Sequence, residues 1–101
     1  MALDMYANGK HEAIYTNEEF IFSLAQADED RYPELLSLWS DFYNSPRISS
    51  TQAGILLHEI IELLSRNGGF ENKLLASIVF RLLQFLSMAD RGGHEIKTKS
   101  D

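Results

Sequence analysis

The chain has 101 residues, carries a formal net charge of −6 at pH 7 and contains no cysteine. This length predicts one domain over residues 1–101 with a single modest core. The lack of cysteine excludes a disulfide framework, a thiol nucleophile and a cysteine-ligated zinc ion. The apolar fraction of 45% is that of a globular protein and excludes disorder over most of the chain.

The first residues do not show a basic start followed by an apolar run, which is the pattern of a secretory signal. The most apolar stretch, residues 74–89, is too short to span a bilayer and carries Arg81 and Gln84 in its middle. We therefore expect a cytoplasmic protein that does not enter a membrane.

Residues 2–15 predict a β-hairpin. Asn8-Gly9 is a preferred pair for a two-residue type I′ turn, because both residues accept a positive φ. Counting outwards from this turn, the alternation of side chains predicts two faces. The face that should lie on the helices holds Leu3, Met5 and Ile14. The opposite face holds Asp4, Tyr6, His11 and Tyr15.

Two helix start signals follow the hairpin. The sequence from Thr16 to Glu19 has the form of a capping box, which predicts a helix from about residue 17 to residues 25–27. Pro33 suits the first turn of a second helix, which should end near Asn44 because Ser45 precedes a proline. The residues expected to be buried on these two helices are Phe20, Leu24, Leu35, Leu38, Trp39 and Phe42.

Ser49 or Ser50 is placed to cap a third helix over about residues 50–66, and Gly92-Gly93 ends a fourth over about residues 70–90. Twelve of the sixteen residues of Leu74–Ala89 are apolar, Leu74 and Phe80 among them, so the fourth helix needs cover on several sides and should be central. The residues expected to face solvent on these two helices are Gln52, Glu59, Glu62, Arg66, Lys73, Ser77, Arg81 and Gln84.

The tail, residues 94–101, leaves two alternatives open. Ile96 and Thr98 favour a strand, and a hairpin alone is marginal in water, so residues 94–99 predict a third strand. A frayed chain end is the other alternative. The expected fold is α+β and mostly α. Four helices within residues 17–91 surround a central C-terminal helix and carry a small antiparallel sheet.

The charge is unevenly distributed. Residues 1–50 hold nine acids and three bases, whereas residues 51–101 hold six of each. Such an acidic half should repel nucleic-acid phosphates and attract a basic protein, although a merely solvated surface explains it too. The candidate binding residues are Asp28, Glu29, Asp30, Glu34, Asp41 and Tyr43.

Three other sets of residues suggest alternatives. The outer hairpin face, with Asp4, Tyr6, His11 and Tyr15, pairs a histidine with a carboxylate, as a general base requires, but has no nucleophile beside it. The run from His58 to Glu62 is similar to the HExxH zinc helix, with Glu62 replacing the second histidine, and indicates a small metal- or ligand-binding enzyme. Excess apolar surface predicts a structural homodimer. Its candidate residues are Leu36, Tyr43, Val79 and Phe80.

The opening LDMYANGK, residues 3–10, resembles the start of small bacterial and phage proteins of unknown function that begin with an LDMY-type strand. This resemblance implies no activity. The chain is also similar in kind to the small acidic immunity proteins that neutralise bacterial toxins, although no motif is shared. We expect a non-enzymatic protein-binding module without a cofactor or a bound metal, with the homodimer and the enzyme as alternatives.

Overall fold

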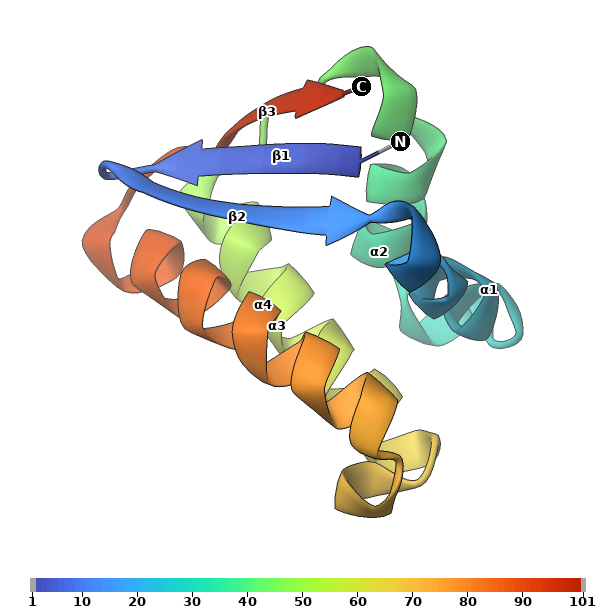
Figure 1. Cartoon of the computed structure of the whole chain (residues 1–101). Helices are drawn as coiled ribbons and strands as arrows, with labels where there is room; N and C mark the ends of the chain where they lie inside the picture. The colour runs from blue at the N-terminus through green and yellow to red at the C-terminus, as the bar shows by residue number, and fades with distance from the viewer. Residues whose placement is uncertain (1, 101) are drawn as a thin grey trace.

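The computed structural model describes residues 2–100 and has an α+β fold that is mostly helical, as the sequence predicts. Its strands and helices are β1 (Ala2–Ala7), β2 (Lys10–Tyr15), α1 (Phe20–Gln26), α2 (Pro33–Ser40), α3 (Ser50–Arg66), α4 (Lys73–Gly92) and β3 (Lys97–Ser100). Figure 1 shows the sheet lying over the α3–α4 pair, with α1 and α2 beyond one end of the sheet.

The sheet is antiparallel with the strand order β2-β1-β3. The hairpin register pairs Leu3 with Ile14 and Tyr6 with His11, and the turn residues Asn8 and Gly9 have φ values of 50° and 71°. Both findings confirm the predicted two-residue turn. The predicted third strand is present, but it covers Lys97–Ser100 rather than residues 94–99, and it pairs with β1 rather than with the open side of β2.

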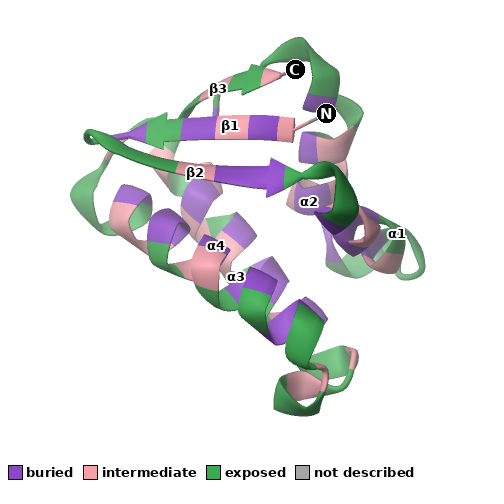
Figure 2. Ribbon diagram, in the orientation of Figure 1, coloured by how far each residue is buried: buried purple, intermediate pink, exposed green. Residues whose placement is uncertain are grey.

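The core lies between the inner face of the sheet and the helices. Leu3, Met5 and Ile14 are buried there, together with one side of α4 and one side of α3. Figure 2 shows buried residues on the side of α4 that faces the sheet and exposed residues on its opposite side. Ser49 caps α3 through its hydroxyl, which accepts from the Gln52 amide at 3.1 Å.

The start of α1 differs from the prediction. Residues Thr16–Glu18 form a 3₁₀ turn, and the Glu18 carboxylate, rather than that of Glu19, reaches back to the Tyr15 amide at 3.0 Å. The first α-helical residue is therefore Phe20. On α1, Phe22 is in the core, whereas Phe20 and Leu24, which were expected to be buried, are only partly buried.

The cover of α4 also differs from the prediction. The helix packs against α3 on one side and approaches β2 on another, but Leu74 is exposed, and Phe80 is only partly covered by the ring of Phe70. Trp39 is partly buried and stacks on Phe22 with ring centroids 4.8 Å apart. Val79, expected on an oligomeric surface, is buried and unable to contact another chain.

The chain itself covers one edge of the sheet. Ile48 and Ile96 exchange two backbone hydrogen bonds of 3.0 and 2.8 Å beside β3. Ser45 and Ser100 exchange two more, each from a backbone amide to the partner's hydroxyl. The segment before α3 therefore blocks the β3 edge, whereas within residues 2–100 no strand covers the β2 edge. Among residues 2–100, no helix has the length and hydropathy that a membrane crossing requires.

Candidate functional site

Two of the predicted acidic residues lie together in a cleft beside α2. Glu34 and Asp41 are seven positions apart and so share one side of the helix with Ser37. The cleft has a volume of about 50 Å³, enough for a few water molecules or the end of one long side chain. The facing wall comes from Pro46, Arg47, Ile48, Gln52 and Leu56.

The charges in this acidic cleft are unbalanced. Within residues 2–100, neither the Glu34 nor the Asp41 carboxylate has a hydrogen-bond or ion-pair partner. Arg47, the one base in the wall, extends instead to Glu95 at 3.2 Å. The cleft therefore presents two free carboxylates beside the neutral polar groups of Ser37 and Gln52.

The acidic triplet before α2 is exposed and only partly neutralised. Asp28 pairs with Arg31 at 2.6 Å, and Arg31 also approaches Glu62 of α3 at 3.4 Å. Glu29 and Asp30 have no ion-pair partner among the described residues. The acidic triplet lies just before α2 in the chain, and the acidic cleft lies beside α2.

Tyr43 belongs to a different group of residues. Its hydroxyl donates to Glu19 at 3.3 Å, and its ring packs against Phe42 and Trp39. Partial burial raises the pKa of the Tyr43 phenol, and the negative charge of Glu19 raises it further. Tyr43 does not line the acidic cleft, so the structure separates it from Glu34 and Asp41.

A buried glutamate of α3 holds the end of α2 that carries Glu34. Glu59 accepts hydrogen bonds from the backbone amides of Leu35 at 2.8 Å and Glu34 at 3.0 Å. These two N–H groups belong to the first turn of α2 and have no acceptor within the helix. The N-cap residue, Tyr32, does not supply a side-chain acceptor for them. The prediction that Glu59 faces solvent is therefore wrong, because α2 crosses α3 at this residue. Burial raises the pKa of the Glu59 carboxyl, and the two N–H bonds only partly oppose that effect.

The predicted set on the outer face of the hairpin, Asp4, Tyr6, His11 and Tyr15, lies only partly together in the structure. The His11 ring nitrogen Nε2 lies 2.9 Å from Asp4 Oδ1, and the ring stacks on Tyr6 at 4.9 Å between centroids. Tyr15 lies apart from this group and contacts the guanidinium of Arg81, 5.4 Å from its ring centroid. The contacts of the His11 ring are with the Asp4 carboxylate and the Tyr6 ring, and neither is a serine or threonine nucleophile.

The structure does not assemble the zinc-like pattern on α3. His58 is exposed, and the carboxylate of Glu62 is taken by Arg31 and Arg66, both within 3.4 Å. Among residues 2–100, no three histidine, aspartate or glutamate side chains are placed to hold one metal ion. The geometry therefore gives no support to metal chemistry at His58 and Glu62.

Sequence reasoning missed one polar network, which is centred on Arg81. This side chain donates to Glu18 at 2.6 Å and to the Ala13 carbonyl at 3.1 Å, and its Nε lies 3.0 Å from Glu12. The hydrogen bond to Glu18 raises the pKa of the guanidinium, which stays charged. The sequence indicated this network only through Arg81 itself, which is a charged residue in the middle of an apolar stretch. A charge at such a position needs a partner.

Comparison of the chain with protein-family models, with curated proteins and with solved structures gives no match. The resemblance of residues 3–10 to small bacterial and phage proteins thus stays a prediction.

Proposed function

We propose that this protein is a non-enzymatic protein-binding module that receives a lysine or arginine side chain of a basic partner in the acidic cleft. The observation that carries this proposal is the pair of unpaired carboxylates, Glu34 and Asp41, in one cleft of α2. A partner cation that enters the cleft finds two acceptors that no residue between 2 and 100 neutralises. Its desolvation is offset by two charge-assisted hydrogen bonds.

The surroundings of the cleft support the same partner chemistry. Residues 28–41 contain five acids and one base, so the negative field extends from the cleft to the acidic triplet. Such a field speeds the encounter with a basic protein and selects against acidic ones. An inhibitor of the immunity type, which covers a basic site of another protein in the cytoplasm, is the role that this chemistry fits best.

The experiment measures binding of fluorescent octa-arginine, with octa-glutamate as the negative probe. The double variant Glu34→Gln/Asp41→Asn should weaken binding by about tenfold or more, since each lost ion pair is worth about 1 kcal/mol in a partly screened site. The matched control is Glu71→Gln/Asp90→Asn, which changes the net charge equally at exposed positions outside the cleft.

Three results would contradict the proposal: equal weakening by both double variants, binding that does not fall with added salt, or no binding of the basic peptide. The partner itself is sought by affinity capture from the source organism. The captured protein should be basic and should be lost with the cleft variant but retained with the control.

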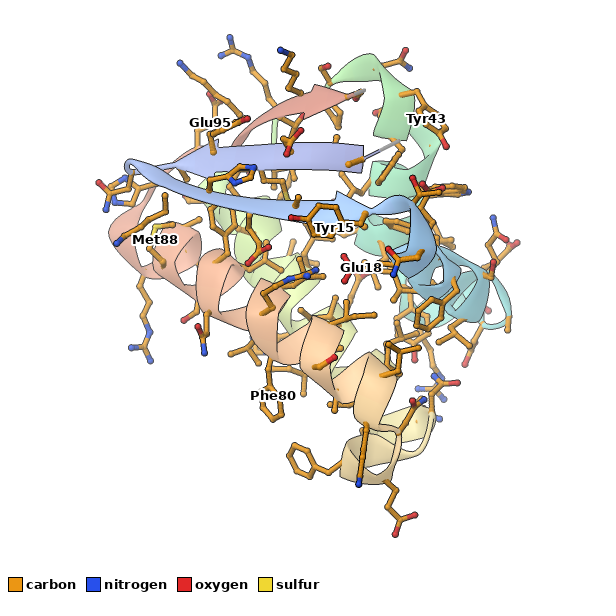
Figure 3. All side chains as sticks on the ribbon, in the orientation of Figure 1. Tyr15, Glu18, Tyr43, Phe80, Met88 and Glu95 are labelled. Carbon is orange, nitrogen blue, oxygen red and sulfur yellow. The ribbon has the colours of Figure 1, made fainter. Side chains whose placement is uncertain are left out.

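A homodimer is a second candidate function, and a separate observation favours it. Phe70 and Phe80 are 72% and 45% exposed and stack on each other with centroids 5.5 Å apart. Ile61 of α3 is also exposed, and Figure 3 shows Phe80 pointing away from the sheet. This surface belongs to the half of the chain with balanced charge, so two copies meet there without strong repulsion.

Sedimentation equilibrium tests the dimer. Wild type should sediment as a dimer, and Phe70→Ser/Phe80→Ser should sediment as a monomer, because the two rings supply most of the exposed aromatic area on this surface. Tyr15→Ser/Tyr43→Ser removes comparable exposed rings elsewhere and should leave the dimer intact. A wild-type monomer at the highest soluble concentration would overturn this candidate.

A further inference from the structure

A second and larger cleft lies between β2 and the C-terminal half of α4. Its volume is about 310 Å³, and it shares no residue with the acidic cleft. Figure 3 shows Met88 between the strand and the helix at this place. From β2 it is lined by Lys10, His11 and Glu12, and from α4 by Arg81, Gln84, Phe85 and Met88. We call it the edge cleft.

The edge cleft borders the β2 edge of the sheet, which residues 2–100 leave partly open. Ala7 and Lys10 flank a two-residue turn and therefore form a hydrogen-bonded pair. Further along the hairpin, pairs without and pairs with backbone hydrogen bonds between the two strands alternate. The backbone N–H and C=O groups of His11, Ala13 and Tyr15 therefore point away from β1. Since β2 is an edge strand, they point toward the side where α4 lies.

Side chains of this protein form hydrogen bonds with most of these outward-pointing backbone groups. The Ala13 amide donates to the Glu12 carboxylate at 2.9 Å, and the Ala13 carbonyl accepts from Arg81. The Tyr15 amide donates to Glu18. Among residues 2–100, Thr16 apart, no side chain bonds to the outward N–H and C=O of His11, and His11 lines the edge cleft. Backbone groups left in this way are a template for one more strand.

The rest of the lining indicates which side chains an added strand would carry. Phe85 and Met88 form an apolar wall that an apolar side chain can cover. Lys10 has no ion-pair partner within residues 2–100, whereas Arg81 is neutralised by Glu12 and Glu18. The free charge of the cleft is therefore a single ammonium group, which favours an acidic neighbour.

From these contacts we infer that the edge cleft binds a short extended peptide segment of a partner protein. The segment adds to β2 at His11 through two backbone hydrogen bonds, places an apolar side chain on Phe85 and Met88, and places an acidic residue beside Lys10. Arg81 and its carboxylates close the edge at Ala13 and Tyr15. A full-length strand, such as β2 of a second copy, is thereby obstructed, but a short segment fits.

The test selects random heptapeptides displayed on phage against the full chain and measures the Kd of the selected peptides. The deciding variants are His11→Pro and His11→Ala. Proline removes the outward N–H at an edge position where no ladder bond is lost, whereas alanine keeps it. Both variants remove the imidazole and its contacts with Asp4 and Tyr6 equally.

The selected peptides should carry an apolar residue next to an acidic one. His11→Ala should keep the wild-type Kd within about twofold, and His11→Pro should raise it by about tenfold or more, as expected for a lost backbone hydrogen bond. Lys10→Gln should weaken acidic peptides selectively. In wild type, peptide binding should shift the His11 amide resonance and slow its hydrogen exchange, a result that does not depend on the folding of any variant.

Four outcomes would overturn the inference. The first is a library that yields no peptide binding below about 1 mM, a weak affinity for a specific site. The second is equal Kd values for His11→Pro and His11→Ala when circular dichroism shows both folded. The third is an unchanged His11 amide on peptide binding. The fourth is a wild-type dimer that His11→Pro dissociates, which would make a second copy the occupant.

Discussion

Arg81, in the middle of α4, donates a hydrogen bond to Glu18 at 2.6 Å, and this pair joins the central helix to the turn that precedes α1. The same guanidinium reaches the carbonyl of Ala13, so that it also fixes the edge of β2. One side chain of α4 thus holds β2 and the turn that follows it, more than sixty residues away in the sequence.

We predict that Arg81→Met destabilises the protein by about 2 kcal/mol. This is less than the 3–5 kcal/mol of a fully buried pair, because Arg81 is 34% exposed and partly solvated. Urea unfolding followed by Trp39 fluorescence measures the change. In a Glu18→Gln background, the same substitution should cost clearly less, because the buried carboxylate is no longer left unpaired. Equal costs in both backgrounds would refute a specific Arg81–Glu18 interaction.

A second prediction concerns the pH dependence that Glu59 imposes on stability. The pKa of Glu59 is raised above its ordinary value of 4.5 in the folded state, chiefly by burial, so the folded chain holds this proton to higher pH than the unfolded chain does. Its contribution to stability is therefore present in full below pH 4.5 and is lost as the pH rises through the raised value.

The comparison of wild type with Glu59→Gln isolates this contribution, because the other carboxyl groups titrate in both proteins. The unfolding free energy of wild type minus that of Glu59→Gln should fall as the pH rises from about 4 to 7. The control Glu71→Gln removes an exposed carboxyl group at another site, and the Glu59→Gln result is compared with it. A difference for Glu59→Gln that grows with pH would show that the two amide bonds outweigh burial.

A third prediction tests the end of α4. Gly93 has a φ of 67°, and a methyl group placed on it would meet no atom within 4 Å. The cost of Gly93→Ala is therefore backbone strain alone, about 1 kcal/mol in urea unfolding. Gly93→Asn should cost less, because asparagine tolerates the left-handed conformation. A larger loss with asparagine than with alanine would contradict this account.

Local patterns predicted most of the fold. The Asn8-Gly9 turn sets the hairpin register, Ser49 caps α3, and Gly93 ends α4, because each depends on the conformational preference of a few adjacent residues. The inner face of Leu3, Met5 and Ile14 follows from the same register. The candidate site was only partly predicted: Glu34 and Asp41 share a cleft, but Tyr43 lies in another group of contacts.

The sequence by itself determined the class of fold, the number of helices, the hairpin and the acidic character of the first half, since periodicity, turn chemistry and charge are local properties. Only the tertiary structure decided that Glu59 is buried under α2, that Arg81 closes part of the β2 edge, and that β3 pairs with β1. Each of these depends on residues more than twenty positions apart. Their contact depends on how whole helices and strands pack, which a local sequence pattern does not indicate.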